Sequence, residues 1–382
     1  MKNLLLDNSK SELEALIKSL GLPSYRASQL YAWLLKGVPY DGMSNLPAAF
    51  LAELSKDYTA SAATIVKILR SSDGSEKYLY RLSDGETVEG VFLPNGYGNT
   101  LCVSTQAGCR MGCAFCASGK GGLSRNLTPG EILGQFIAAC GETKNEKRKT
   151  KNDGDSVGGD PLGAPHPSES SLITYHSSSR PIANIVLMGS GEPLDNYDNV
   201  VKFIRLVSDP GGLKVSPRNI SLSTCGIVPK IRELADENFG VTLSLSLHAT
   251  TDEARAKLLP IAKKYPLKDT LSAVKYYFEK TGRRVIFEYA LIKGVNTSKE
   301  DVVRLAGLAK GFPCHVNLIR LNRIKESSLA GCNPKESAEF LKVLTDLGVS
   351  ASLRRSFGAD IAGACGQLRA REKRVEGKYA RE

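Results

Sequence analysis

The sequence predicts an α/β protein built around a full or partial βα barrel, preceded by a small helical module and a β-hairpin connector. From about residue 100 onward, apolar runs of strand length alternate with amphipathic stretches of helix length. This alternation is typical of a parallel sheet that is covered by helices. Six or seven such units fit a full or partial barrel, in which ligands bind at the C-terminal ends of the strands.

The barrel elements can be assigned in chain order over residues 99–370. Strands are expected in TLCVST, IANIVLM, NISLST, VTLSLSLHA, RVIFEYALI, HVNLIRL and VSASLRRS. Helices are expected in GEILGQFIAAC, YDNVVKFIRLV, VPKIRELADEN, LKDTLSAVKYYFEKTG, KEDVVRLAGLAK and KESAEFLKVLTDLG.

The residues before the barrel predict two smaller units. Residues 1–60 are expected to be helical, because apolar side chains recur at helical spacing after a capping box formed by Ser11 and Glu14. A second helix is expected over Ala27–Leu35. Residues 61–98 predict a β-hairpin connector, with turns at the Asp-Gly pairs of residues 73–74 and 84–85.

One segment interrupts the barrel. Residues 143–181 are rich in Lys, Gly, Pro and Ser and have few large apolar side chains, so they predict a flexible insertion. Residues 371–382 form a basic tail. The basic side chains of either segment would contact RNA or simply be solvated; those of the insertion are Lys144, Lys147, Arg148, Lys149 and Lys151.

The composition excludes several classes of protein. The chain has 382 residues, of which 42% are hydrophobic and 24% charged, so it can form a core and is not disordered throughout. Its apolar runs are shorter than the roughly 18–20 residues that span a bilayer, and its N-terminus lacks the pattern of a secretory signal. A cytoplasmic protein with no membrane partner is expected. The net charge of +11 fits a polyanionic partner such as nucleic acid.

The strongest chemical signal is a group of three cysteines, Cys109, Cys113 and Cys116, that follows the first expected barrel strand. A structural zinc ion would need a fourth Cys or His nearby, and none follows before Cys140. Three thiolates instead suit a [4Fe–4S] cluster with one iron open to a small molecule. The CxxxCxxC spacing, with Phe115 before the third cysteine, resembles that of the radical S-adenosylmethionine (SAM) enzymes.

A glycine-rich turn, residues 189–194, follows the second expected strand. Such turns are common and are weak evidence alone. In a radical SAM barrel, this turn resembles the Gly-Glu-Pro motif that receives the amino group of SAM. Gly191 would let the backbone approach, and Glu192 would accept a hydrogen bond from the ammonium.

Seven segments in order extend the resemblance to one family. They are TLCVSTQAGC, CRMGCAFCASG, MGSGEPLDN, ISLSTCGIVPKI, LSLSLHATTDEAR, VNLIRLN and ADIAGACGQL. The chain resembles the RlmN family, the adenosine-C2 methyltransferases of 23S rRNA and tRNA, with the Cfr C8-methyltransferases as close neighbours. The helical module resembles the accessory domain of that family, which implies a role in RNA binding. The departures are Ser118, Ser190, Phe357 and Ala359, where the family usually has Thr, Met, Arg and Asp, together with the long insertion.

The resemblance implies a mechanism that uses two SAM molecules per turnover. One SAM methylates Cys365, and the second yields a radical that activates this methyl group for addition to C2 of the adenosine. Cys102 then attacks the Cys365 sulfur, which releases the RNA and leaves a transient disulfide. Glu89 matches the proton acceptor of the family, with Glu86 as the alternative. The targets implied are an adenosine of the peptidyl transferase centre and the adenosine next to the anticodon in tRNAs.

The resemblance also implies the remaining contacts and partners. The residues implied to bind SAM are Gly191, Glu192, Ser223, Ser246, Leu247, His248 and Asn322. A flavodoxin-type electron donor and a monomeric state are implied as well. No role is assigned to Cys140, Cys225, Cys314 or Cys332. Candidate RNA contacts beside the site are Arg320, Arg323, Lys325, Arg354 and Arg355.

Two alternatives stay open at this point. One is C8 methylation of the same rRNA adenosine, as in Cfr enzymes, because Phe357 and Ala359 depart from the pattern of the C2 family. The other belongs to a different class: a zinc-bound RNA-binding protein without catalytic activity, in which the three cysteines would recruit a distant fourth ligand.

Overall fold

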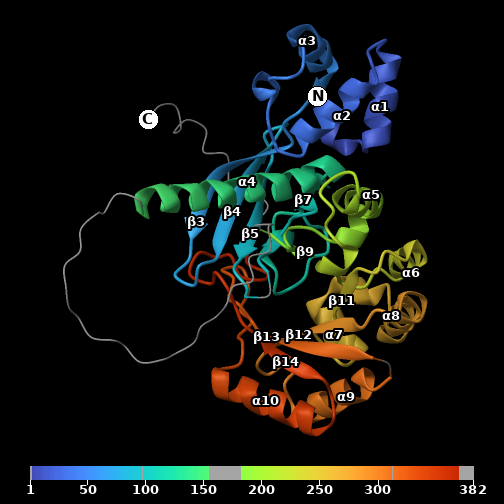
Figure 1. Cartoon of the computed structure of the whole chain (residues 1–382). Coiled ribbons are helices and arrows are strands. Elements are labelled where there is room, and N and C mark those ends of the chain that lie inside the picture. Colours follow the sequence, from blue (N-terminus) through green and yellow to red (C-terminus); the bar gives the residue numbers. More distant parts are fainter. Residues whose placement is uncertain (1, 97, 155–181, 312, 370–382) are drawn as a thin grey trace, which may run out of the picture.

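The computed structural model describes residues 2–96, 98–154, 182–311 and 313–369, with the backbone alone for residues 144–154. Figure 1 shows three parts along the chain: a helical module at the N-terminus, a connector of antiparallel strands, and a curved sheet with helices on its outside. In the described part of the chain, no helix combines the length and apolar character needed to cross a bilayer.

The N-terminal module contains three helices, α1 (Lys10–Ser19), α2 (Tyr25–Leu34) and α3 (Ala48–Asp57). It is closed by two short parallel strands, β1 (Asn3–Leu4) and β2 (Tyr58–Thr59). The helices are as expected, but the predicted capping box was wrong by two residues.

Ser9 rather than Ser11 caps α1. The Ser9 Oγ accepts from the amide of Glu12 at 3.2 Å, and the amide of Ser9 donates to Glu12 Oε2 at 2.6 Å. Both serines have a glutamate three residues later, so spacing alone could not separate them. Ser9 has the extended backbone that a cap requires, whereas Ser11 already lies inside the helix.

The connector consists of β3 (Ala63–Arg70), β4 (Glu76–Leu82) and β5 (Thr87–Leu93), all antiparallel. Strand β5 also pairs antiparallel with β6 (Thr100–Cys102), which places Val91 opposite Cys102. The expected hairpin is therefore part of the main sheet, and hydrogen bonds continue across the predicted boundary at residues 98 and 99.

The barrel half of the sheet is parallel throughout. Apart from β7 (Gln106–Gly108) and β8 (Leu123–Asn126), which form a separate hairpin, each strand from β6 onward pairs with the next strand along the chain. After β6 these strands are β9 (Asn184–Leu187), β10 (Ile220–Thr224), β11 (Thr242–Ser246), β12 (Val285–Leu291), β13 (Cys314–Arg320) and β14 (Ala351–Arg354). Within the described residues, the sheet has ten strands and runs from β3 to β14 without returning to its start. The barrel is therefore partial.

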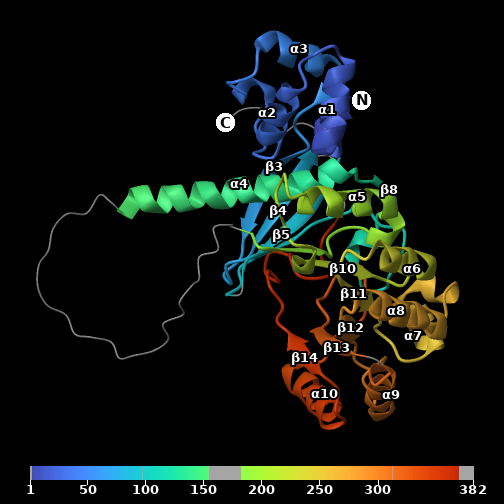
Figure 2. The same cartoon turned by 45° about the vertical axis from the view of Figure 1, so that its right-hand side comes forward.

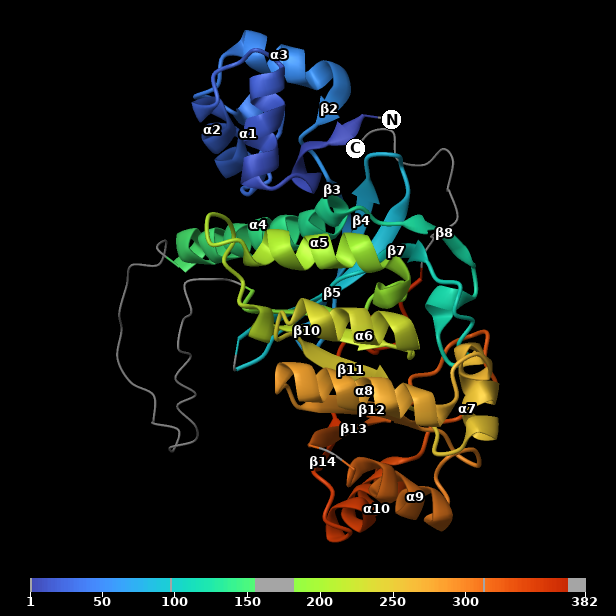
Figure 3. The ribbon, with the colours of Figure 1, turned by 90° about the vertical axis from the view of Figure 1, so that its right-hand side faces the viewer.

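In the described part of the barrel, the helices are α4 (Pro129–Gly154), α5 (Tyr197–Ser208), α6 (Val228–Glu237), α7 (Asp252–Leu258), α8 (Leu267–Thr281), α9 (Lys299–Ala309) and α10 (Pro334–Asp346). In Figure 3, α4, α5, α6 and α8 lie side by side across the outer face of the sheet. Strand β12 shows how each face is used. Val285, Phe287, Tyr289 and Leu291 are fully buried in the main core, whereas Glu288 and Ala290 line the inner pocket described below.

Helix α4 corrects part of the expected insertion. It continues to Gly154, so residues 143–154 are helical, although their composition predicted a loop. Lysine and glutamate are good helix formers, and they continue a helix that the apolar residues before them begin. Figure 2 shows this end of α4 extending away from the N-terminal module and the other helices. Residues 155–181, the side chains of the insertion lysines and the tail lie outside the described residues.

Short elements complete the fold. A hairpin of β7 (Gln106–Gly108) and β8 (Leu123–Asn126) leaves the sheet directly after β6. Short 3-10 helices occupy connections among the described residues: Leu5–Asp7, Tyr40–Gly42, Ala117–Gly119, Pro193–Asn196, Pro217–Asn219 and Pro260–Lys263.

Candidate active site

The cysteine loop is held between β7 and β8. Gly108, just before Cys109, has a φ of +90°, and a Cβ there would lie 2.0 Å from the carbonyl oxygen of Gly122, so only glycine fits. Two amides inside the loop donate to other parts of the barrel. Ala114 donates to the carbonyl of Leu258 at 2.9 Å, and Ala117 donates to that of Gly366 at 2.8 Å. The loop is thereby fixed against α7 and the C-terminal segment.

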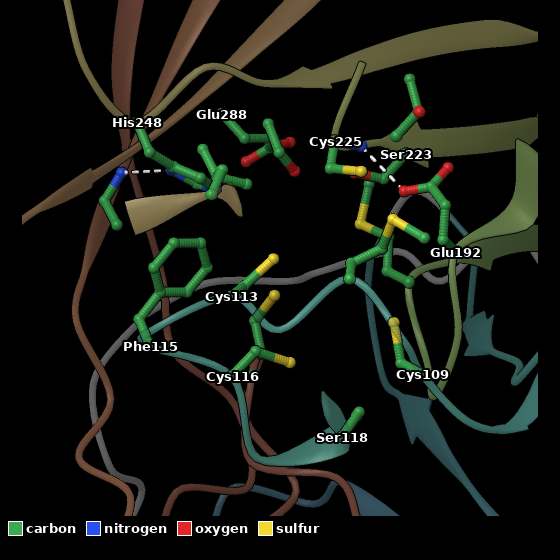
Figure 4. Close-up of a pocket in the computed structure, with 18 of the residues that line it drawn as sticks. Cys109, Cys113, Phe115, Cys116, Ser118, Glu192, Ser223, Cys225, His248 and Glu288 are labelled. Carbon is green, nitrogen blue, oxygen red and sulfur yellow. Dashed lines mark hydrogen bonds between the residues drawn. The ribbon is translucent and has the colours of Figure 1, made fainter. Parts of the chain in front are cut away.

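Cys109, Cys113 and Cys116 all line one pocket at the C-terminal ends of the strands. Figure 4 shows their sulfur atoms in this pocket, below Glu192 and Cys225. Burial raises the pKa of Cys109 to about 12 and raises that of Cys113 as well, with the neighbouring thiols adding to the effect. Buried thiolates of this kind are stabilised by bonds to metal ions. The donor set therefore fits a metal centre bound by three cysteines.

The arrangement does not match a mononuclear zinc site. Among the described residues, no three His, Cys, Asp or Glu side chains are grouped as a single ion requires. Cysteines that ligate a [4Fe–4S] cluster bind separate irons and need not converge on one point. The three cysteines that line the pocket are therefore more compatible with a cluster than with one zinc ion.

Glu192 is positioned by backbone amides of two segments. Its Oε1 accepts from Leu194 at 3.1 Å, and its Oε2 accepts from Cys225 at 2.8 Å, which joins the turn after β9 to the end of β10. Burial raises the pKa of Glu192, and these hydrogen bonds oppose the rise. Gly191 beside it has a φ of +107°, and a Cβ there would lie 2.7–2.9 Å from Gln106. Both residues line the pocket, as predicted.

His248 lies in the wall of the pocket next to the cysteine loop. Its backbone has a φ of +53°, which is rare outside glycine, and its ring packs edge-on against Phe115 with centroids 4.6 Å apart. Nδ1 accepts from the amide of Ala290 at 3.0 Å, so Nε2 carries the proton in the neutral ring. Burial, followed by the charge of Arg255, lowers the pKa of His248 to about 3. His248 is therefore a neutral side chain that can donate a hydrogen bond from Nε2.

The other predicted SAM contacts divide into two groups. Ser223, Ser246 and Asn322 line the pocket from the ends of β10, β11 and β13. Leu247 does not, because its side chain is fully buried in the main core. Its main chain is nevertheless close, and its amide donates to the carbonyl of Glu288 at 3.1 Å.

A second pocket adjoins the first and is lined by both Cys102 and Cys365. Cys102 is only 8% exposed, whereas Cys365 is exposed and lines both pockets. Burial raises the pKa of Cys102 to about 12, the nearby Cys365 adds to this, and the charge of Arg354 opposes it. Asn322 donates through Nδ2 to the carbonyl of Cys365 at 3.2 Å. The structure thus brings the two predicted reactive thiols into one cavity beside the three cysteines.

Glu89 lies on β5, on the face that also carries Val91 and Leu93, and these two residues line the second pocket. The carboxylate is buried, forms an ion pair with Lys77 at 2.9 Å and accepts from the amide of Arg369 at 2.8 Å. Glu86, the alternative proton acceptor, instead accepts from Ser124 on β8. Of the two, Glu89 is the one that shares a strand face with residues lining the second pocket.

Sequence reasoning missed three residues of the site. Glu288 lines the pocket from β12, with its Oε2 free of hydrogen bonds among the described residues and 3.7 Å from Arg354 Nη1. Arg354 lines both pockets, although the sequence suggested only an RNA contact. Cys225, left without a role, also lines the first pocket. The glutamate inside the apolar run RVIFEYALI was the available signal, because acidic side chains are rarely fully buried.

The candidate RNA contacts lie in different surroundings. Arg323, Lys325 and Arg355 are exposed, and Arg355 stacks over the ring of Phe357 at 4.9 Å. Arg320 is only half-buried, but its Nε is buried and has no hydrogen-bond partner among the described residues.

Comparisons with known proteins agree with this geometry. A model of the radical SAM superfamily matches residues 173–306. A protein of Clostridium perfringens (strain 13 / Type A), described as a probable dual-specificity RNA methyltransferase RlmN, is 45% identical to this chain, with 97% of each chain covered. The corresponding protein of Clostridium botulinum (strain Eklund 17B / Type B) is 43% identical over 97% of this chain and 96% of its own length. The chain belongs to the RlmN family.

A solved structure supports the fold of this RlmN-family chain over its whole length. The crystal structure of a radical SAM methyltransferase from Sphaerobacter thermophilus superimposes with a TM-score of 0.84 and is 37% identical. The match covers 97% of this chain and 100% of that one. The resemblance drawn from the motifs is confirmed, and the superfamily implies a [4Fe–4S] cluster and SAM as cofactors.

Three of the departures from the usual RlmN pattern line the two pockets or lie beside residues that do. Ser118 donates through Oγ to the carbonyl of Leu368 at 2.7 Å and so retains the hydroxyl of threonine. Ser190 is buried, and its Oγ has no hydrogen-bond partner in the described part of the chain. Phe357 lines the second pocket beside Cys365.

Proposed function

We propose that this radical SAM RNA methyltransferase acts at C2 of an adenosine in the peptidyl transferase centre of 23S rRNA and of the adenosine next to the anticodon in tRNA. The observation that carries the proposal is the position of Cys365, which lines both the pocket of the three cysteines and that of Cys102. The relatives described as dual-specificity RNA methyltransferases support RNA as the substrate.

Cys109, Cys113 and Cys116 would hold the cluster, and Gly191, Glu192, Ser223, Ser246, His248 and Asn322 would bind SAM, with Leu247 contributing its main chain. When bound, the [4Fe–4S] cluster supplies an electron and an open iron to which SAM can bind. The neutral ring of His248 donates a hydrogen bond without adding charge to the pocket.

Cys365 carries the carbon that is transferred. Its sulfur takes a methyl group from one SAM molecule, and a second SAM is consumed when this group is activated, which gives two SAM per turnover. C2 of adenine is electron-poor and does not attack a methyl donor directly, so a carbon held on sulfur is needed. The exposure of Cys365 lets a nucleotide approach, and the target base would leave its stack to do so.

Cys102 and Glu89 complete the reaction. After the activated carbon has bonded to C2, the adduct has to lose one electron and one proton to restore the aromatic ring. The electron would return to the bound cluster that supplied one, and Glu89 takes the proton. Its carboxylate shares a strand face with the lining of the second pocket. The Cys102 sulfur then bonds to the Cys365 sulfur while the bond from that sulfur to the RNA carbon breaks. The electron pair of the broken bond stays on the carbon, which takes up a proton and becomes the methyl group. The resulting disulfide is reduced before the next turnover.

The test is to incubate the reconstituted protein with 23S rRNA fragments, SAM and reductant, and to identify the modified base by mass spectrometry. We expect 2-methyladenosine in the rRNA and, in a parallel reaction, in tRNA. A product methylated at C8 would replace the proposal with the Cfr-like alternative. No methylation by a protein that absorbs near roughly 400 nm, as iron–sulfur proteins do, would refute it. We also propose a flavodoxin-type donor, a cytoplasmic location and a monomer, which sedimentation can check.

A further inference from the structure

Arg255 has an unusual environment behind the pocket. It lies in α7, is fully buried, and is the largest side chain with that degree of burial. Among the described residues it forms no ion pair, and its Nη1 has no hydrogen-bond partner. Asp252, a nearby acid in the same helix, accepts from the amide of Leu267. A buried and unpaired charge is costly, so a compensating interaction is expected.

The bonds that Arg255 does form go to main-chain carbonyls at the ends of two adjacent strands. Its Nη2 donates to Cys225 after β10 at 2.6 Å and to Ser246 at the end of β11 at 3.4 Å. Its Nε donates to Leu247 at 3.3 Å. One guanidinium thus joins the two strand ends that carry Ser223 and Ser246. Carbonyl oxygens are neutral, so these bonds orient the group without cancelling its charge.

Arg255 is linked to the wall of the cysteine pocket by its own helix and by its hydrogen bonds. Leu258 of α7 accepts from the amide of Ala114 in the cysteine loop. Cys225, whose carbonyl accepts from Arg255, lines the same pocket as Cys113. Burial lowers the pKa of Arg255, and Cys225, Asp252 and Cys113 oppose this lowering. In the proposed holoenzyme, Cys113 is a thiolate of the cluster. Three thiolates outweigh the charge of the iron–sulfide core, and reduction adds one more negative charge. A fixed cation nearby therefore stabilises the reduced cluster more than the oxidised one.

We propose that Arg255 is a positioning residue with two effects on the cofactors. Its side chain joins the ends of β10 and β11 into one SAM-binding edge, and its buried charge raises the reduction potential of the cluster. This inference rests on the proposed function, because it needs a cluster at Cys109, Cys113 and Cys116.

The test uses the cluster-loaded full chain and two measurements other than turnover: a redox titration of the cluster and the Kd for SAM. Arg255→Gln removes the charge, and we expect a more negative midpoint potential and SAM binding weakened about tenfold, as expected from the loss of one or two hydrogen bonds. Arg255→Lys keeps the charge but cannot reach all three carbonyls, so we expect an unchanged potential and weaker SAM binding. Lys257→Gln, an exposed change on the same helix, should alter neither.

An Arg255→Gln protein with full cluster content and the potential of the unmodified protein would overturn the proposal. If that variant does not fold, Arg255→Lys decides alone. Weaker SAM binding at an unchanged potential supports the proposal, and any other combination overturns it. A chain that binds no cluster would refute the proposed function itself, whereas a cluster with an unshifted potential refutes only the role of Arg255.

Discussion

The SAM-binding pocket and the segment that carries Cys365 are built in different ways. In the pocket, side chains such as Glu192 and His248 are fixed by amides of the barrel itself. The Cys365 segment is held by both the barrel, through residues such as Asn322 and Ala117, and the connector. Gly358 donates to Asp73 at 2.8 Å, and the amide of Arg369 donates to Glu89 at 2.8 Å.

The two regions differ in the size of the molecule that each is proposed to bind. A small cofactor can enter a pocket whose walls are already in place, so little is gained from movement there. In the proposed reaction a nucleotide of a folded RNA reaches Cys365, and a segment held by polar contacts can yield to it. The four predictions below test this contrast, from the largest expected effect to the smallest.

Cys365→Ala should abolish methylation completely while leaving the cluster in place, because the transferred carbon would have no carrier. Absorbance of the reconstituted protein and product analysis by mass spectrometry measure the two properties separately. Cys332→Ala is the matched control, since Cys332 is half-buried and lies outside both pockets. Methylated RNA from the Cys365→Ala protein would show that the mechanism is wrong.

Cys102→Ser should stop the reaction after the RNA is bound to Cys365, because serine cannot break the sulfur–carbon bond. A covalent protein–RNA adduct should then accumulate and be visible on a denaturing gel. Cys314→Ser provides a control at another buried cysteine. Normal release of methylated RNA would exclude Cys102 as the resolving thiol.

Glu192→Gln should weaken SAM binding about ten- to hundredfold, since the glutamine NH₂ would face an amide donor and leave it unsatisfied, at a cost of about 1–3 kcal/mol. Isothermal titration calorimetry measures the effect on the cluster-loaded protein. Glu233→Gln on the surface of α6 serves as control, because its ion pair with Lys230 is exposed. Equal affinities of Glu192→Gln and the unmodified protein for SAM would show that SAM binding does not depend on the hydrogen bonds that fix Glu192.

Asp73→Asn should have the smallest effect and loosen the Cys365 segment. Burial acts to raise the pKa of Asp73, but hydrogen bonds from Ser75, Gly358 and Ser71 outweigh it and lower the pKa to about 2. Its contribution to the free energy of unfolding is therefore complete above the ordinary aspartate pKa of about 4 and is lost as the pH falls toward 2.

Because Asp73 is partly exposed, the contribution should be below about 1 kcal/mol. Thermal unfolding of the two proteins should differ slightly at neutral pH and coincide below about pH 2. Hydrogen exchange of residues 358–365 at neutral pH should be faster in Asp73→Asn and unchanged in the surface control Asp57→Asn. Equal exchange would contradict the role of this contact.

Much of this architecture could be predicted from the sequence, because periodicity and motif spacing are local properties. The strand–helix alternation, the cysteine loop and the turn at Glu192 all lie where the pattern indicated. The Cys102–Cys365 pair came from family resemblance, since no local signal joins residues so far apart in the chain.

The features that the sequence did not predict depend on packing between distant segments. Glu288 and Arg354 belong to the site because β12 and β14 present them on the same inner face, and Arg255 reaches two strand ends from a helix. Leu247 was placed with SAM through its motif, yet strand alternation turns its side chain into the core. The start of the insertion is helical because α4 continues past its apolar residues, which composition alone did not reveal.

The continuity of the sheet from β3 to β14 has a consequence for recombination between relatives. An exchange made at residue 98 would separate β5 from β6 and expose the edge that carries Cys102, so the isolated barrel should aggregate. An exchange near residue 61, between β2 and β3, cuts no pairing within the ten-stranded sheet. The helical module could therefore be replaced by that of a relative, whereas β3–β5 must stay with the barrel.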